Sequence, residues 1–295
     1  MRKIVIIGGP TAIGKTNFAI ELAKKFNSEI ISADSRQFYQ ELNIGVAKPS
    51  KIQLKEVKHH FINNISIKDK YSIGEYEKNA LQLTYRLFKK HKTIFVCGGS
   101  GLYIDALCEG LHEFPIIDKQ VKKKTREDLI KMGIEFLNQE LKKNDIETYK
   151  KIDKNNPRRI TRAIEVYRSS GKPYSYYINK KKKKRSFSTI FINLIDSREN
   201  IYNNINKRVD NMIQNGLIDE AKKLYNYKDL QALQTIGYQE VFQYLEKNLT
   251  LEKMIAEIKQ NTRRYAKKQI NWFKHEKYRK FKITEEEKII DLIKD

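Results

Sequence analysis

The pattern with the clearest chemistry is a phosphate-binding loop near the N-terminus. Residues 9–16 read GPTAIGKT and fit G-x-x-x-x-G-K-[ST] at every position. Backbone N–H groups of such a loop converge on phosphate oxygens, and the N-terminus of the following helix adds partial positive charge. Lys15 supplies a point charge to the terminal phosphate, and the Thr16 hydroxyl can ligate Mg²⁺. The expected phosphate contacts are Gly9, Pro10, Thr11, Ala12, Ile13, Gly14, Lys15 and Thr16.

Two aspartates that follow apolar runs are the acidic candidates for this site. The loop alone fits ATP, GTP or any other diphosphate ester, so a further group must define the reaction. Asp34 follows the run 29–32 and is suited to act as a general base or a metal-side acid, with a helix cap or an Asx-turn as the structural alternative. Asp196 closes the run 189–195 and could hold Mg²⁺ in a kinase or cap a helix.

Alternating strands and helices must position these groups. Amphipathic spacing predicts helices over 15–26 and 74–90, between short apolar runs typical of buried strands. This alternation predicts an α/β fold with a parallel sheet and right-handed crossovers. Ligands of such sheets bind at the carboxyl ends of the strands, where the turns 8–16, 33–37 and 98–101 fall. The strands are expected at 3–7, 29–32, 93–97 and 189–195.

The middle of the chain has a different character. It has little strand signal and many Lys and Arg, with helical spacing around 118–131, 133–143 and 156–169. From residue 199 onward the pattern is mostly helical and includes a long segment near 250–274. The expected domains are a first part of the core at 1–112, a helical insertion at 113–187 and a second part of the core at 188–295.

Positive charge dominates the composition: 59 Lys and Arg against 36 Asp and Glu give +23 over 295 residues. Apart from compositional bias, this charge predicts an anionic partner, whether nucleic acid, a membrane surface or a phosphorylated small molecule. A hydrophobic fraction of 40% excludes wholesale disorder, and two cysteines exclude a disulfide framework. No apolar stretch approaches the ~18 residues of a membrane span. We therefore expect a cytoplasmic protein.

Two basic clusters could contact a nucleic acid backbone. Arg158, Arg159 and Arg162 lie on one predicted helix, where two of them share a face. Residues 180–185 are six consecutive cations. Such clusters add affinity for RNA without sequence specificity, and a solvated loop is the alternative for the run 180–185.

Six motifs, taken together and in order, resemble the bacterial tRNA dimethylallyltransferases, also called tRNA isopentenyltransferases. The match runs from residue 4 to about residue 275, over nine-tenths of the chain. The motifs are GPTAIGKT (9–16), SADSRQFY (32–39), CGGSGLYIDAL (97–107), NPRRITRAIEV (156–166), QTIGYQE (234–240) and NTRRYAKKQINWF (261–273).

This resemblance implies a P-loop kinase-like parallel sheet core with an inserted helical domain that grips the tRNA anticodon stem-loop. It implies transfer of a dimethylallyl group from dimethylallyl diphosphate to N6 of adenosine 37, next to the anticodon, with release of diphosphate. Mg²⁺ is the expected cofactor, and neither a membrane nor a stable protein partner is implied. A P-loop small-molecule kinase remains the alternative, together with an RNA-binding module that has a vestigial phosphate loop.

The resemblance also implies residue roles. The catalytic group would be Asp34 as general base, Lys15 and Arg208 on the diphosphate, and Ser100, which stands where the family usually has Thr. Lys122 stands where Arg is common, which weakens any bidentate contact. The implied tRNA contacts are Asp34, Ser35, Arg36, Gln37, Ser100, Lys122, Arg158, Arg159, Ile160, Thr161 and Arg162.

The residue types fit this chemistry. Diphosphate leaving an allylic carbon carries heavy negative charge, which a phosphate loop, Lys15, Arg208 and Mg²⁺ would neutralise as it develops. We expect nearby cations to keep Asp34 ionised at neutral pH. A stacked loop base cannot reach the allylic carbon, so the target adenosine must be extruded.

Overall fold

The computed structural model describes residues 2–180, 182 and 184–295 and divides into two compact units. One unit runs to Cys108 and resumes at Arg185, and the other comprises Glu109–Lys184. The insertion was expected at 113–187, so the structure places both of its boundaries three or four residues earlier. We describe the two units separately.

The larger unit is built on a parallel six-stranded sheet with the strand order β3-β2-β4-β1-β5-β6. This confirms the α/β prediction and brings the turns that follow β1, β2, β4 and β5 to one edge of the sheet. The strands are β1 (Lys3–Gly8), β2 (Ile30–Ser32), β3 (His59–His60), β4 (Thr93–Cys97), β5 (Ser188–Leu194) and β6 (Arg279–Phe281).

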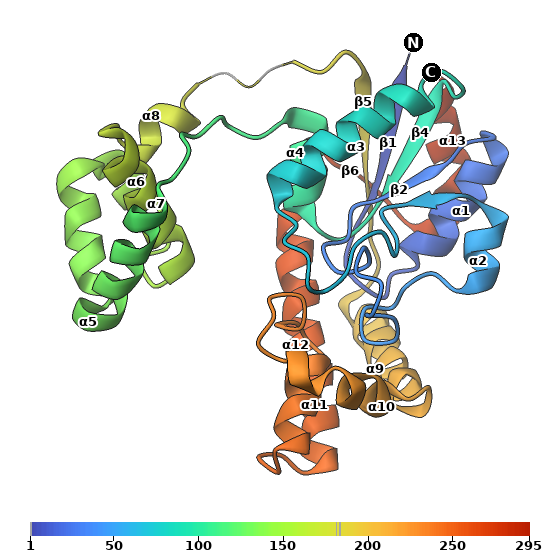
Figure 1. Cartoon of the computed structure of the whole chain (residues 1–295). Helices are drawn as coiled ribbons and strands as arrows, with labels where there is room; N and C mark the ends of the chain where they lie inside the picture. Colours follow the sequence, from blue (N-terminus) through green and yellow to red (C-terminus); the bar gives the residue numbers. More distant parts are fainter. Residues whose placement is uncertain (1, 181, 183) are drawn as a thin grey trace. The chain divides into compact units, whose positions relative to one another are not determined.

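Helices cover both faces of this sheet, as Figure 1 shows. Successive side chains of β1 lie on opposite faces of the sheet. Ile4 and Ile6 belong to one hydrophobic core, and Val5 and Ile7 belong to another. The first core packs beneath α3 and α4, and the second beneath α1 and α13. These helices are α1 (Lys15–Lys25), α3 (Ile73–Leu87), α4 (Gly101–Glu109) and α13 (Glu286–Lys294).

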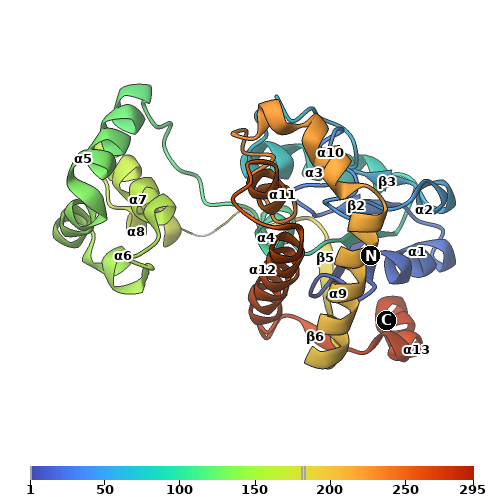
Figure 2. The ribbon, with the colours of Figure 1, turned by 90° about the horizontal axis from the view of Figure 1, so that it is seen from below.

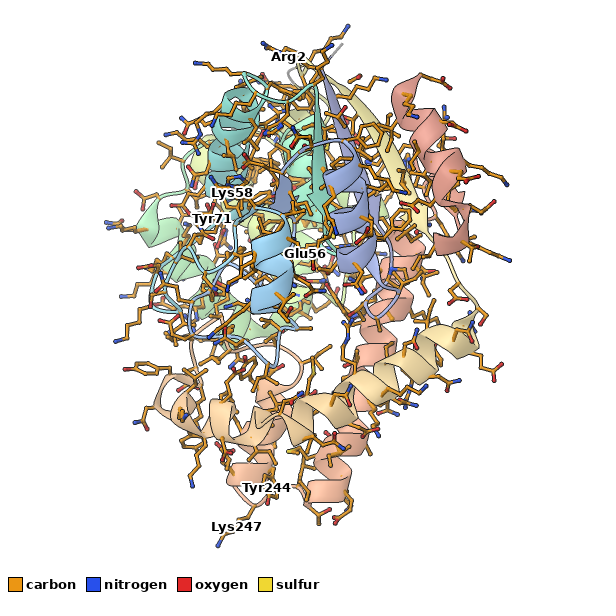
Figure 3. The ribbon with its side chains drawn as sticks, turned by 90° about the vertical axis from the view of Figure 1, so that its right-hand side faces the viewer. Arg2, Glu56, Lys58, Tyr71, Tyr244 and Lys247 are labelled. Carbon is orange, nitrogen blue, oxygen red and sulfur yellow. The ribbon has the colours of Figure 1, made fainter. Side chains whose placement is uncertain are left out.

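A third hydrophobic core lies among helices outside the sheet layers, where α9 packs against α12 (Figure 2). Near the end of α11, Tyr244 and Lys247 lie at the end of this unit opposite Arg2 (Figure 3). The remaining helices of the unit are α2 (Lys51–Glu56), α9 (Arg198–Gln214), α10 (Leu217–Lys223), α11 (Tyr238–Leu245) and α12 (Leu251–Trp272), with short 3₁₀ turns at Tyr225–Tyr227 and Ile283–Glu285.

The smaller unit is entirely helical in its described residues. Its longest helix breaks at Gly133, where a φ of 78° interrupts the helical backbone at the first residue of the expected segment 133–143. Leu137, Leu141, Ile160 and Ile164 form its core. The helices are α5 (Lys119–Asn144), α6 (Ile146–Lys151), α7 (Pro157–Ser170) and α8 (Tyr174–Ile178). Across the described residues of the whole chain, every helix is too short or too polar to cross a bilayer.

Candidate active site

A cavity of about 640 Å³ lies in the larger unit, at the edge of the sheet where the strands end. Its walls come from the turns after β1, β2 and β4, from the segment 45–49, and from α9 and α12. The position agrees with the rule that ligands of parallel sheets bind at the carboxyl ends of the strands.

The phosphate loop forms one wall of the cavity. Lys15 Nζ donates to the carbonyl oxygen of Pro10 at 2.7 Å, which folds the loop around its own lysine. Gly14 has a φ of 95° directly before α1, a conformation that glycine adopts without strain. Gly9 lies so close to β5 that a β-carbon there would fall 2.8 Å from the Leu194 carbonyl oxygen. The loop residues that line the cavity are Thr11, Ala12, Gly14, Lys15 and Thr16, whereas Gly9, Pro10 and Ile13 shape the loop.

Two cations face this loop. Arg208, from α9, donates through Nη1 to Thr11 Oγ1 at 2.9 Å and lines the cavity. Burial lowers the pKa of Lys15 to about 8, and the neighbouring Arg208 acts in the same direction. The lowered pKa shows that two cations lie close together in a poorly solvated part of the cavity. A bound anion would stabilise both charges.

Asp34 lies at the end of β2 and lines the same cavity. Its Oδ1 accepts from the backbone N–H of Arg36 at 2.9 Å, as in an Asx-turn. Asp34 therefore makes the local turn and also lines the cavity. Burial raises the pKa of Asp34, and the lowering effects of the Arg36 amide and Lys15 offset it only in part. Burial therefore outweighs the nearby cations and makes Asp34 a stronger base than an exposed aspartate, while its ionisation at neutral pH stays a prediction.

The three residues after Asp34 are held by neighbouring loops. The N–H of Ser35 donates to Ser100 Oγ at 3.1 Å, which gives Ser100 a positioning contact at the start of α4. Gln37 donates to the carbonyl oxygen of Ala47 at 3.2 Å. Arg36 reaches the segment before α11, where its guanidinium donates to the carbonyl oxygens of Gln231 and Gln234 at 3.1 and 3.4 Å.

The same cavity also has an apolar wall. It belongs to the third hydrophobic core and combines residues of α9, α12 and two loops. Val209 and Ile258 are 1% and 2% exposed, so this wall is backed by well-packed structure. The lining side chains are Val46, Val209, Met212, Ile236 and Ile258.

A half-buried carboxylate holds the loop that carries Val46. Glu220 Oε1, on α10, accepts from the N–H groups of Ile44 and Gly45 at 3.0 and 3.1 Å and from the Tyr238 hydroxyl at 2.5 Å. Gly45 packs directly on the Tyr238 ring, since a β-carbon there would fall 2.5 Å from Cε2. The segments 44–49 and 234–240 therefore work together as one wall of the cavity.

Two cavity residues from α12 were missed by the sequence analysis. Gln269 accepts from the Thr11 N–H at 2.8 Å and donates to the carbonyl oxygen of Gly99 at 3.0 Å. Tyr265 lies one turn earlier and is 38% exposed, but the protein around its hydroxyl and the nearby Asp34 carboxylate raise its pKa to about 12. Both lie inside the motif 261–273, but nothing in a polar helix surface distinguishes a buried glutamine from a solvated one.

The structure gives Asp196 a local role. Its Oδ1 accepts from the Ser197 N–H at 2.7 Å and from Asn200 Nδ2 at 2.9 Å, while Ser197 itself caps α9. Asp196 is exposed and belongs to the turn that leads into this helix. The kinase-type role considered for it receives no support from these contacts.

The predicted tRNA contacts of the insertion lie on α5 and α7 of the smaller unit. Lys122, Arg158 and Arg159 are exposed. Arg162 lies over the Phe114 ring at 5.2 Å. Ile160 corrects the expectation, because it is 0% exposed in the core of this unit and its side chain serves packing. Thr161 Oγ1 donates to its own helix, at Pro157.

The run 180–185 separates into different environments. Arg185 is anchored in the larger unit, donating to the carbonyl oxygens of Ala106 and Leu107 and to Glu77 Oε1 at 2.8, 3.0 and 2.6 Å. It therefore caps the end of α4, where helix carbonyls attract a cation. Lys180 lies over the Tyr176 ring at 4.5 Å and Lys182 pairs with Glu109 at 3.6 Å. Lys181 and Lys183 lie outside the described residues.

Comparison with known proteins places this site in context. The family model described as IPP transferase matches residues 37–276. A tRNA dimethylallyltransferase of Christiangramia forsetii is 49% identical over 271 residues, which are 92% of this chain and 90% of that protein. The tRNA dimethylallyltransferase 1 of Bacteroides thetaiotaomicron is 38% identical over 295 residues, which cover 100% of this chain and 96% of that protein.

Solved structures give the same grouping. A tRNA isopentenylpyrophosphate transferase of Bacillus halodurans superposes with a TM-score of 0.73 at 34% identity, covering 100% of this chain and 96% of that one. A eukaryotic dimethylallyltransferase acting on tRNA superposes with a TM-score of 0.78 at 28% identity, covering 92% of this chain and 70% of that one.

Proposed function

The chain belongs to the IPP transferase family, and we propose that it is a tRNA dimethylallyltransferase. The dimethylallyl group of dimethylallyl diphosphate moves to N6 of adenosine 37 in tRNA, next to the anticodon, and diphosphate leaves. The curated relatives carry this name, and their similarity extends over 92% and 100% of this chain.

One observation carries the choice of donor: the cavity has a cationic phosphate-loop wall and an apolar wall. Lys15 and Arg208 lie on the first, and Met212 and Ile258 lie on the second. A prenyl diphosphate has the same division, with a charged head and a hydrocarbon tail, and apolar contact stabilises the tail when it leaves water.

Asp34 supports the transfer step as the base. In that step the bond between the allylic carbon and the bridging oxygen breaks, and a bond from N6 to that carbon forms. The proton on N6 passes to the Asp34 carboxylate, and diphosphate departs carrying the electron pair. The raised pKa of Asp34 suits this role, because a base whose pKa is closer to neutrality accepts a proton more readily.

Positive charge at the phosphate loop stabilises the leaving group. Lys15 and Arg208 lie where the diphosphate would gain charge, and the burial of Lys15 strengthens each electrostatic contact. Holding the amine against the allylic carbon contributes as well, since N6 of adenine is a weak nucleophile.

We infer that Mg²⁺ accompanies the diphosphate. The Thr16 side chain lines the cavity at the start of α1, and its hydroxyl is a hard oxygen donor of the kind that Mg²⁺ accepts alongside phosphate oxygens and water. When bound there, the ion would neutralise charge on the leaving diphosphate.

A donor-competition assay tests the proposal. Unmodified tRNA is incubated with the full chain and dimethylallyl diphosphate labelled in the prenyl group, and in parallel with γ-labelled ATP. Prenyl label in tRNA, with the γ-phosphate untransferred, is expected. Transfer of the γ-phosphate to a small molecule, without prenyl transfer, would establish the kinase alternative instead.

A further inference from the structure

The helices α9 and α12 run antiparallel along the cavity, and two polar contacts define their register. Arg263 donates to Asn206 Oδ1 at 2.8 Å, and Lys259 pairs with Asp210 at 2.6 Å. Moving four residues forward on α9 therefore corresponds to moving four residues back on α12. By the same register, Met212 lies within one residue of the level of Ile258.

The phosphate end of this arrangement is fixed by Arg208. Its guanidinium donates to Thr11 in the phosphate loop, and Met212 follows it by four residues on the same face of α9. One helical turn separates the two positions, ~6 Å along the axis. Both side chains line the cavity.

This spacing matches the length of a short prenyl tail. The four in-line carbons of a dimethylallyl chain extend ~5 Å from the leaving oxygen, given a C–C bond of ~1.5 Å. With the diphosphate at Arg208, the two terminal methyl groups would reach Met212. A second isoprene unit would need as much length again, in the direction of Met212 and Ile258.

Met212 packs beside two side chains of the cavity wall that leave little room for rearrangement. Val209 and Ile258 are almost completely buried, and Met212 packs with them in the third hydrophobic core. A longer chain running in this direction would meet the Met212 thioether and the packed side chains of Val209 and Ile258. Methionine is flexible and unbranched, so it can fit closely around two methyl groups.

We propose that Met212 sets the length of the prenyl donor by closing the tail end of the cavity. The inference rests on the proposed function and adds the residue that determines donor specificity. It predicts that shortening this side chain opens space in line with the tail, whereas replacing it at equal volume does not.

The test compares dimethylallyl diphosphate with geranyl diphosphate, the donor that is one isoprene unit longer, using the full chain and the same tRNA. Met212→Ala is expected to raise the ratio of kcat/KM for the longer to the shorter donor by ~10- to 200-fold. Met212→Leu keeps the volume and should leave the ratio near that of wild type. Ile213→Ala truncates the next residue of α9, which packs in the same core outside the cavity lining, and should also leave it unchanged.

The outcomes separate the two claims. A wild-type chain that transfers neither donor contradicts the proposed function, whereas a wild-type chain that transfers only the shorter one supports it. An active Met212→Ala chain with an unchanged ratio overturns the role of Met212. If thermal melting shows that Met212→Ala does not fold, Met212→Phe is the deciding variant. Its larger side chain should raise the KM for dimethylallyl diphosphate. An unchanged KM would also overturn the inference.

Discussion

Gln269 accepts a hydrogen bond from the backbone N–H of Thr11 at 2.8 Å, across 258 residues of sequence. The same carboxamide donates to Gly99 at 3.0 Å, so one side chain that is 5% exposed joins the phosphate loop to the turn after β4. The contact is tight, since a β-carbon at Gly99 would fall 2.1 Å from Gln269 Nε2. Through Gln269, α12 holds both loops in one arrangement.

Replacing Gln269 by Leu should therefore lower the stability of the protein and also slow the transfer reaction. The change leaves a buried acceptor on Gly99 without this partner, which costs about 1–3 kcal/mol, and a partly buried donor on Thr11, which costs less. Urea unfolding should show a lower free energy of unfolding, and Gln269→Glu, which keeps the acceptor, should lose less donor affinity than Gln269→Leu. Equal donor affinity in the two variants would contradict the contact with Thr11.

Asp34→Asn should abolish most of the transfer reaction while sparing donor binding. The amide has nearly the shape of the carboxylate but cannot take the N6 proton, and loss of a general base typically costs ~10²- to 10⁴-fold in rate. Single-turnover kinetics with saturating donor and tRNA measures this step. Asp196→Asn makes the same chemical change at an exposed turn residue and should behave as wild type. A full single-turnover rate in Asp34→Asn would remove this carboxylate from the reaction.

Donor affinity should fall as the pH rises above about 8. Lys15 carries its charge below its lowered pKa of about 8 and loses it above, while the prenyl diphosphate is fully ionised there. Titration of the free protein with a non-reactive donor analogue should show binding that weakens toward tenfold per pH unit. Lys15→Arg keeps its charge throughout this range, so its affinity should stay level. Level affinity in the wild type would contradict the assignment of Lys15.

The acidic side of the pH profile should reflect Asp34. Only the ionised carboxylate can accept a proton, so kcat/KM is expected to rise with pH through a pKa above that of an ordinary aspartate. If kcat/KM instead rises with the pKa of an ordinary exposed aspartate, burial does not control the pKa of Asp34.

The salt dependence of tRNA binding should depend on the exposed end of α7. Each lost phosphate contact lowers the slope of log K against log salt by ~0.7 to 0.9. Arg158→Gln with Arg159→Gln should therefore flatten the slope by ~1.5 in a filter-binding titration. Lys89→Gln with Lys90→Gln, at exposed positions after α3, is the matched control and should retain the wild-type slope. Equal slopes for the two double variants would place the tRNA elsewhere.

Local patterns were sufficient for the inner strands of the sheet and for the phosphate loop. The strands β1, β4 and β5 are continuous apolar runs, and the phosphate loop has a spacing that only a strand–turn–helix context satisfies. The interruption of α5 also followed from its sequence, because Gly133 takes a backbone conformation that ends helical periodicity. These features depend on residues close together in the chain.

The remaining features depend on distant contacts. The outer strands β3 and β6 have two and three residues, too few for a periodic signal, and they exist because neighbouring strands offer hydrogen bonds. The role of Glu220 in holding Ile44 and Gly45 requires the fold to bring α10 to a loop far earlier in the chain. Ile160 shows the reverse case, since its place among arginines suggested a surface that its burial excludes.

The most direct test of the central claim is nucleoside analysis of tRNA after reaction with the purified chain. We predict that enzymatic digestion and mass spectrometry will find one dimethylallyl group on N6 of adenosine 37, with one diphosphate released for each group transferred. The modification should need dimethylallyl diphosphate and should disappear with Asp34→Asn. Unmodified adenosine 37 in tRNA that the chain binds, with dimethylallyl diphosphate and Mg²⁺ present, would contradict the account.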